Sequence, residues 1–240
     1  MQEEKTYRLR QYRAGLKAGL PVMLGFIPVG IAYAIMAGQA GFTVSQTILM
    51  SVAVFAGASQ MMSTGMYAQG AGLIAMIITT FIVNLRHLIM STCVMNRMKE
   101  GSLPLRLLAA FGVTDESFAI FTTEKEEHRS VFFFLGLITI TYTSWICGSA
   151  IGALVNDFLP AVVSASFGIA LYALFIAILM PGLKGNLRLA ILVVITALVN
   201  MVLSRFISSG WALIASTLIC AGAGVFFVDL GEEGTENEQS

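Results

Sequence analysis

The chain has 240 residues, of which 57% are hydrophobic and only 12% are charged, and its formal net charge is zero. Soluble domains carry about 25% charged residues, so this composition excludes an ordinary soluble fold. The apolar runs are continuous, whereas a transmembrane β-barrel needs short alternating segments. Several runs are longer than the roughly 18 residues that indicate a transmembrane helix. We therefore expect an all-α polytopic membrane protein.

The two ends of the chain differ in charge. Residues 1–17 are predominantly basic, and the charged residues of 229–240 are all acidic. The first segment is predicted to be a basic cytoplasmic tail that marks topology, and it is too short to suggest nucleic-acid binding. The acidic end is predicted to be a disordered tail. Residues 18–228 between them are expected to form a single transmembrane transport domain.

The first predicted span covers residues 18–37 and contains the sequence GFIPVG. Pro28 removes a hydrogen bond from the helix, and the glycines beside it allow the backbone to bend. Two interpretations remain open. The helix is either kinked for structural reasons or broken, so that it offers backbone polar groups to a substrate, as in many transporters.

The next apolar run, residues 45–68, is long enough to span but is rich in Gly, Ser and Thr. If this run and the following span at 71–95 both crossed, Arg97, Lys99 and Arg106 would lie outside, against the positive-inside rule. If residues 45–68 are re-entrant or broken, those basic residues become cytoplasmic. Irregular backbone is tolerated at membrane depth where it lines a cavity. We favour a re-entrant or broken segment over two full crossings.

Charged residues interrupt the stretch 104–127, which is not expected to span, although Thr114-Asp115-Glu116 has the composition of a helix start. Further spans are predicted at 131–155, 158–180, 187–206 and 210–228. The sequence thus predicts about six to seven transmembrane helices, with both termini in the cytoplasm.

Two polar clusters interrupt the apolar runs, Gly57-Ala58-Ser59-Gln60 and Asn84-Leu85-Arg86-His87. Ionisable residues inside spans are costly and usually mark functional sites. The guanidinium of Arg86 cannot be deprotonated, so its burial requires an acceptor such as a carboxylate. The alternative is that Arg86 lies near the cytoplasmic end of its span and extends to lipid headgroups.

Three further residues are candidates for proton transfer. His87 could exchange protons near neutral pH, or it could be a hydrogen-bonded packing residue. Asp115 and Glu116 are adjacent, so on a helix they point about 100° apart and cannot both face one ligand. One of them could pair with Arg86 or carry a proton; otherwise they are ordinary helix-start acids. The cysteines and methionines lack zinc or copper spacing, so neither a metal nor another cofactor is expected.

Four sequences occur in the order GFIPVGIAYAIMAGQAG, FAGASQ, TTFIVNLRHLIMS and TDESFA. With the later run FGIALYALFIAILMP and the overall length, they resemble the AzlC-type branched-chain amino acid permeases of bacteria. The resemblance covers nearly the whole chain after the basic tail. It implies the large subunit of a two-component exporter of leucine, isoleucine, valine or their analogues. It also implies a multi-pass protein of the bacterial inner membrane whose partner is a small AzlD-like membrane subunit.

An amino acid zwitterion needs partners for its carboxylate and its ammonium group, together with an apolar pocket. The predicted substrate-binding residues are Pro28, Gly57, Ser59, Gln60, Asn84 and Arg86. No GxxxxGK[ST] motif for ATP is present, so an ion gradient, expected to be of protons, would drive transport. The predicted proton-coupling residues are His87, Asp115 and Glu116.

Two other classes of protein compete with a transporter. One is an intramembrane serine hydrolase with Ser59 as nucleophile and His87 as base. Gln60 follows Ser59 and breaks the GxSG pattern of rhomboid-like proteases. The other is an assembly subunit without transport of its own. We expect a transporter and no enzyme activity.

Overall fold

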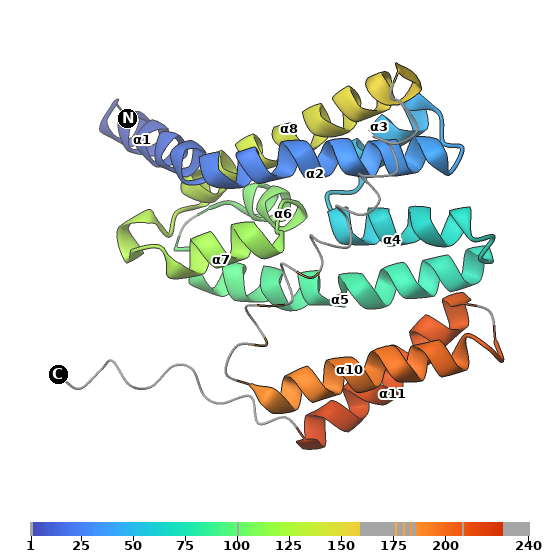
Figure 1. Cartoon of the computed structure of the whole chain (residues 1–240). Coiled ribbons are helices and arrows are strands. Elements are labelled where there is room, and N and C mark those ends of the chain that lie inside the picture. The colour runs from blue at the N-terminus through green and yellow to red at the C-terminus, as the bar shows by residue number, and fades with distance from the viewer. Residues whose placement is uncertain are drawn as a thin grey trace. The chain divides into compact units, whose positions relative to one another are not determined.

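The computed structural model describes residues 2–99, 101–158, 186–207 and 209–227, with Ile176, Met180 and Leu183. All regular elements in these ranges are helices (Figure 1), as predicted. The chain divides into two compact units, Met1–Gly70 with Thr80–Tyr172 and Ala71–Thr79 with Ala173–Ser240. The helix α5 (Leu73–Arg97) begins in the second unit and continues into the first.

The first unit is built on the contact of α1 (Gln2–Ala18) and α2 (Leu20–Gln39) with the long helix α8 (Val131–Val155). Glycines allow these backbones to approach closely. A β-carbon on Gly148 in α8 would lie 2.5 Å from the carbonyl oxygen of Ile27, and one on Gly15 in α1 would overlap the carbonyl oxygen of Phe133. Glycines in both α1 and α8 therefore allow these close helix contacts.

Helix α2 is continuous through Pro28. The broken-helix interpretation of this segment is therefore wrong, because the hydrogen-bonded turns resume on either side of the proline and the α8 contact supports them. The Pro28 side chain is exposed.

Three described helices are long and apolar enough to cross a membrane: α2, α5 and α8. They confirm the predicted spans at 18–37, 71–95 and 131–155. In the second unit, α10 (Leu187–Leu203) and α11 (Ser209–Phe227) occupy the predicted segments 187–206 and 210–228. The predicted span at 158–180 lies almost wholly outside the described residues, as does the acidic tail, so the number of crossings stays a prediction.

The predicted break in residues 45–68 is confirmed. Helix α3 (Val44–Ala53) ends at an extended residue, Val54, and α4 (Gly57–Ala68) begins after Ala56. Figure 1 shows that α3 begins and α4 ends on the same side of the unit, next to the C-terminal end of α2, so the two helices form a hairpin. Neither helix is long enough to cross a bilayer.

A second pair of short helices follows α5. Helix α6 (Leu103–Phe111) and α7 (Asp115–Thr123) are separated by Gly112, Val113 and Thr114. A β-carbon on Gly112 would lie 2.6 Å from the side chain of Ile138, so this connection packs directly on α8. Thr114 caps α7 in a reciprocal capping box with Ser117, which confirms the predicted helix start. The short 3-10 turns η1 (Glu126–His128) and η2 (Asn156–Phe158) flank α8.

The basic segment at the N-terminus is a packed helix. Gln11 is 2% exposed, and its Nε2 donates to the Glu127 carbonyl at 3.0 Å while its Oε1 lies 3.0 Å from His128 Nδ1. The sequence predicted only a topology signal here, because the segment carries too many charges for a hydrophobic pattern to be visible.

Candidate functional site

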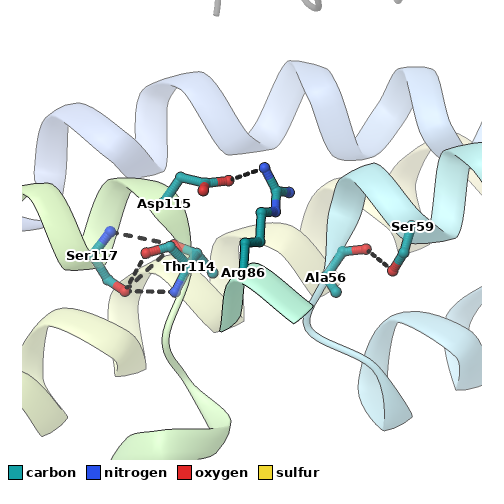
Figure 2. Close-up of polar contacts among 6 residues, drawn as sticks. All are labelled: Ala56, Ser59, Arg86, Thr114, Asp115 and Ser117. Atoms are coloured by element: carbon teal, nitrogen blue, oxygen red, sulfur yellow. Dashed lines mark hydrogen bonds and ion pairs between the residues drawn. The ribbon is translucent and has the colours of Figure 1, made fainter. Parts of the chain in front are cut away.

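The centre of the candidate site is an ion pair between two helices of the first unit. Arg86 Nη1 on α5 lies 2.8 Å from Asp115 Oδ2, at the first residue of α7 (Figure 2). The two side chains are 39% and 43% exposed, so the pair remains open on one side. The predicted pairing of Arg86 with an acid at 115 or 116 is confirmed, and Asp115 is the partner.

Arg86 does not lie at the end of its helix. Helix α5 continues for about three turns after Arg86, to Arg97. The guanidinium pairs within the protein, which argues against the alternative of a side chain that extends to lipid headgroups. The arginine is thus held near the middle of α5, with a carboxylate as its acceptor.

The site has unused hydrogen-bonding groups. Among the described residues, the buried Nε of Arg86 and the buried Oδ1 of Asn84 have no hydrogen-bond partner. A buried polar atom without a partner costs about 1–3 kcal/mol, so such atoms are normally satisfied by water or a ligand. The predicted residues Asn84 and Arg86 therefore offer one acceptor and one donor that the fold does not use.

The start of α4 contributes backbone donors. Its N-cap residue, Ala56, provides no side-chain cap, and the first amide with an intrahelical acceptor is that of Gln60, which donates to the Ala56 carbonyl at 3.0 Å. The amides of Gly57, Ala58 and Ser59 precede this bond and carry the positive end of the helix dipole. In Figure 2 the Arg86 side chain extends between the first turn of α7 and the first turn of α4. A positive arginine and free helix amides suit a carboxylate.

The two polar side chains at the start of α4 are occupied within the protein. Ser59 is 1% exposed, and its hydroxyl donates to the Ala56 carbonyl at 2.9 Å. Gln60 is also 1% exposed: its Nε2 donates to Ser51 Oγ at 3.3 Å, and its Oε1 accepts from Trp145 Nε1 at 2.9 Å. In this arrangement both residues stabilise the hairpin, and their predicted role in substrate binding stays a prediction.

The other predicted site residues are not members of the ion pair. His87 is half-buried and adjacent to Arg86 on α5, and Glu116 is half-buried beside Asp115 on α7. Burial raises the pKa of the Glu116 carboxyl above its usual range. The Ser59 hydroxyl donates to the Ala56 carbonyl and, among the described residues, makes no hydrogen bond to His87, so the geometry gives no support to the serine hydrolase.

Sequence reasoning missed the contribution of α8. Trp145 and Ser149 on this helix hydrogen-bond to the α3–α4 hairpin, and the Tyr142 hydroxyl donates to the Val52 carbonyl at 2.6 Å. The signal was present in the sequence TYTSWICGSAIG, in which polar side chains recur inside an otherwise apolar span.

The helices and the polar site inside them define a polytopic membrane protein. The AzlC protein family matches residues 21–159, more than half of the chain, and the chain belongs to this family. The match begins in α2 and ends after α8, so it includes both pairs of short helices, Arg86 and Asp115. The predicted resemblance is confirmed.

Several individual proteins are similar to this chain. An uncharacterized membrane protein of Archaeoglobus fulgidus is 34% identical over 177 residues, covering 73% of this chain and 77% of the relative. The inner membrane protein YgaZ of Escherichia coli is 30% identical over 188 residues, covering 75% and 76%. The branched-chain amino acid transport protein AzlC of Bacillus subtilis is 27% identical over 149 residues, covering 61% and 58%. No solved structure matches the chain.

Proposed function

We propose that this protein exports branched-chain amino acids from the bacterial cytoplasm in exchange for protons. We further propose that it lies in the inner membrane and works with a small AzlD-like membrane subunit. Family membership and the name of the Bacillus subtilis relative support the substrate class. The observation that carries the proposal is the Arg86–Asp115 ion pair, which Figure 2 shows between the first turn of α7 and the uncapped first turn of α4.

The charges of this site are complementary to an amino acid zwitterion. The substrate carboxylate would bind the guanidinium of Arg86 and the free amides at the start of α4. The substrate ammonium would bind the carboxylate of Asp115. Arg86 and Asp115 pair with each other in the structure, so neither charge would be left without a counter-ion when the substrate leaves.

This arrangement suggests how protons drive export. Asp115 can pair with Arg86, with the substrate ammonium or with a proton, and only one of these can occupy the carboxylate at a time. A proton that arrives from outside would release the substrate and would itself be carried inward, which is the exchange required for export. Glu116 is adjacent to Asp115 on α7 and His87 is adjacent to Arg86 on α5, so both are candidates to pass the proton to or from Asp115.

Membrane orientation and the partner complete the proposal. By the positive-inside rule, the basic residues of α1 and those from the end of α5 to α6 support a cytoplasmic N-terminus. Helix α5 leaves large apolar side chains exposed, including Phe81, Leu88 and Ile89. Lipid or the small subunit would cover these side chains.

The test uses inverted membrane vesicles that contain this chain and the small subunit. Respiration acidifies the vesicle interior, so we expect accumulation of radiolabelled leucine or valine that an uncoupler abolishes. Arg86→Ala should remove the accumulation, whereas Arg13→Ala on the exposed face of α1 should not. Absence of uptake with both subunits present and a verified proton gradient would contradict the proposal.

A further inference from the structure

A closed ring of buried hydrogen bonds joins the α3–α4 hairpin to α8. Trp145 Nε1 donates to Gln60 Oε1 at 2.9 Å, and Gln60 Nε2 donates to Ser51 Oγ at 3.3 Å. Ser51 Oγ donates to Ser149 Oγ at 2.8 Å, and Ser149 Oγ donates to the carbonyl of Trp145 at 2.9 Å. The ring therefore returns to the residue where it began.

All four members of the ring are inaccessible to solvent. Ser51 and Ser149 are 0% exposed, Gln60 is 1% exposed and Trp145 is 3% exposed. Polar groups buried this deeply are costly unless each is hydrogen-bonded, and the ring satisfies both ends of the Gln60 amide. Ser51 belongs to α3 and Gln60 to α4. Each helix of the hairpin therefore has its own side-chain hydrogen bond to α8.

Aromatic packing fixes the tip of the hairpin at the same place. A β-carbon on Gly57 would lie 2.7 Å from the indole ring of Trp145, so only glycine allows α4 to begin against this ring. Tyr33 stacks on the other side of the network, with its ring centroid 5.9 Å from that of Trp145 at an interplanar angle of 23°. Phe26 packs edge-on to both Trp145 and Phe55. The start of α4 is thus held between α2 and α8.

We infer that Trp145 and Gln60 are positioning residues that hold the free amides at the start of α4 beside Arg86. This inference rests on the proposed function for its transport consequence, but its structural content does not depend on transport. Gln60 lies one turn into α4, and its backbone amide makes the first intrahelical hydrogen bond. A hydrogen bond between Gln60 and α8 therefore sets the direction in which the first amides point. Gln60 acts on the substrate through the backbone and not through its own side chain.

The test measures the accessibility of the hairpin tip. The three native cysteines, Cys93, Cys147 and Cys220, are replaced by serine or alanine. Ala58→Cys then reports on the tip through its rate of reaction with a membrane-permeant maleimide. We expect Trp145→Phe, which loses one buried hydrogen bond, to increase this rate by about tenfold, and Gln60→Met, which also loses the bond to Ser51, to increase it at least as much. The double variant should react no faster than Gln60→Met, because the bond between Trp145 and Gln60 is already broken there.

Matched controls separate positioning from general loosening. Trp211→Phe makes the same substitution on α11, at a side chain that is 45% exposed, and should leave the rate unchanged. Ser149→Ala keeps the Trp145–Gln60 and Gln60–Ser51 bonds and removes the bond from Ser51 to α8, so its rate should be intermediate. This milder variant keeps the inference testable if Trp145→Phe does not fold.

Transport gives an independent second measurement. In vesicles with the small subunit, the KM for leucine should rise about tenfold in Trp145→Phe while kcat changes less than about twofold, because a displaced amide weakens binding. If the variants are labelled faster but the wild-type protein does not transport leucine, the result would support positioning and contradict the proposed function. An unchanged labelling rate in folded Trp145→Phe and Gln60→Met would overturn the inference.

Discussion

Arg86 and Asp115 lie 29 positions apart in the chain, yet their side chains form an ion pair with 2.8 Å between Nη1 and Oδ2. The pair connects the middle of a long helix, α5, to the first turn of a short one, α7. The negative carboxylate also lies at the positive end of the α7 dipole, which stabilises it further. An acid held in this way can exchange one cationic partner for another without being left uncompensated.

The competition proposed at Asp115 predicts a specific pH dependence. In the wild type, the KM for leucine on the cytoplasmic side should rise as the pH falls, because protons and the substrate ammonium compete for one carboxylate. Asp115→Asn removes the carboxylate, so its KM should be about tenfold higher near neutral pH and nearly independent of pH. Initial rates of uptake into inverted vesicles across a pH series measure both effects. A parallel pH dependence in wild type and Asp115→Asn would contradict the competition.

Glu116 predicts a pH dependence of stability. Burial raises the pKa of the Glu116 carboxyl, so the folded protein binds this proton more tightly than the unfolded chain. Stability is therefore lost as the pH rises above the pKa of the unfolded chain, about 4.3. Glu116→Gln should melt a few degrees higher than wild type at pH 7, and the difference should disappear below about pH 4.

Thermal unfolding in detergent, followed by intrinsic fluorescence, tests this prediction. Glu3→Gln on the exposed face of α1 is the matched control and should melt like wild type at both pH values. Equal melting temperatures for Glu116→Gln and wild type at pH 7 would show that the carboxyl is better solvated than the fold implies.

The close contact of α2 with α8 makes Gly148 intolerant of substitution. In Gly148→Ala the new β-carbon would meet the Ile27 carbonyl oxygen at 2.5 Å, so the helices must separate. We expect a loss of several degrees in melting temperature or a failure to fold. Gly25→Ala on α2 is the control, because no atom lies within 4 Å of its β-carbon, and alanine favours a helix interior by roughly 1 kcal/mol. If Gly148→Ala and Gly25→Ala changed the melting temperature equally, this result would contradict the close contact of α2 with α8 at Gly148.

The α3–α4 hairpin predicts which side of the membrane its ends face. Ser45→Cys and Gln69→Cys, at its two exposed ends, should both react with an impermeant maleimide added from the periplasmic side. Glu127→Cys in the turn before α8 should react only from the cytoplasmic side. Reaction of Ser45→Cys and Gln69→Cys from opposite sides would show that residues 45–68 cross the membrane fully.

Much of the fold was predictable from local physical chemistry. Long apolar runs and the placement of Arg97, Lys99 and Arg106 predicted the spans α2, α5 and α8 and the break in residues 45–68. Thr114 before two acids predicted the start of α7. These features depend on composition over one or two helical turns, or on length, which a sequence displays directly.

The arrangement of the site was only partly predictable. The cost of burying Arg86 indicated that an acid must lie near it. Whether Asp115 or Glu116 is the partner in the ion pair depends on how α7 packs against α5. The ring of Trp145, Gln60, Ser51 and Ser149 depends on three helices meeting, and no local pattern specifies such a contact. Of the two interpretations of Pro28, the structure rules out only the broken helix, because a proline is compatible with a continuous helix when a neighbour such as α8 supports it.

Binding of leucine and two of its analogues tests the central claim most directly. The complex of both subunits in lipid nanodiscs is titrated with leucine, with leucinol, which lacks the carboxylate, and with 4-methylpentanoate, which lacks the ammonium group. We predict that wild type prefers leucine to both analogues. Arg86→Gln should lose the preference over leucinol alone, and Asp115→Asn should lose the preference over 4-methylpentanoate alone. Unchanged preferences in both variants would contradict the assignment of the substrate carboxylate to Arg86 and of its ammonium group to Asp115.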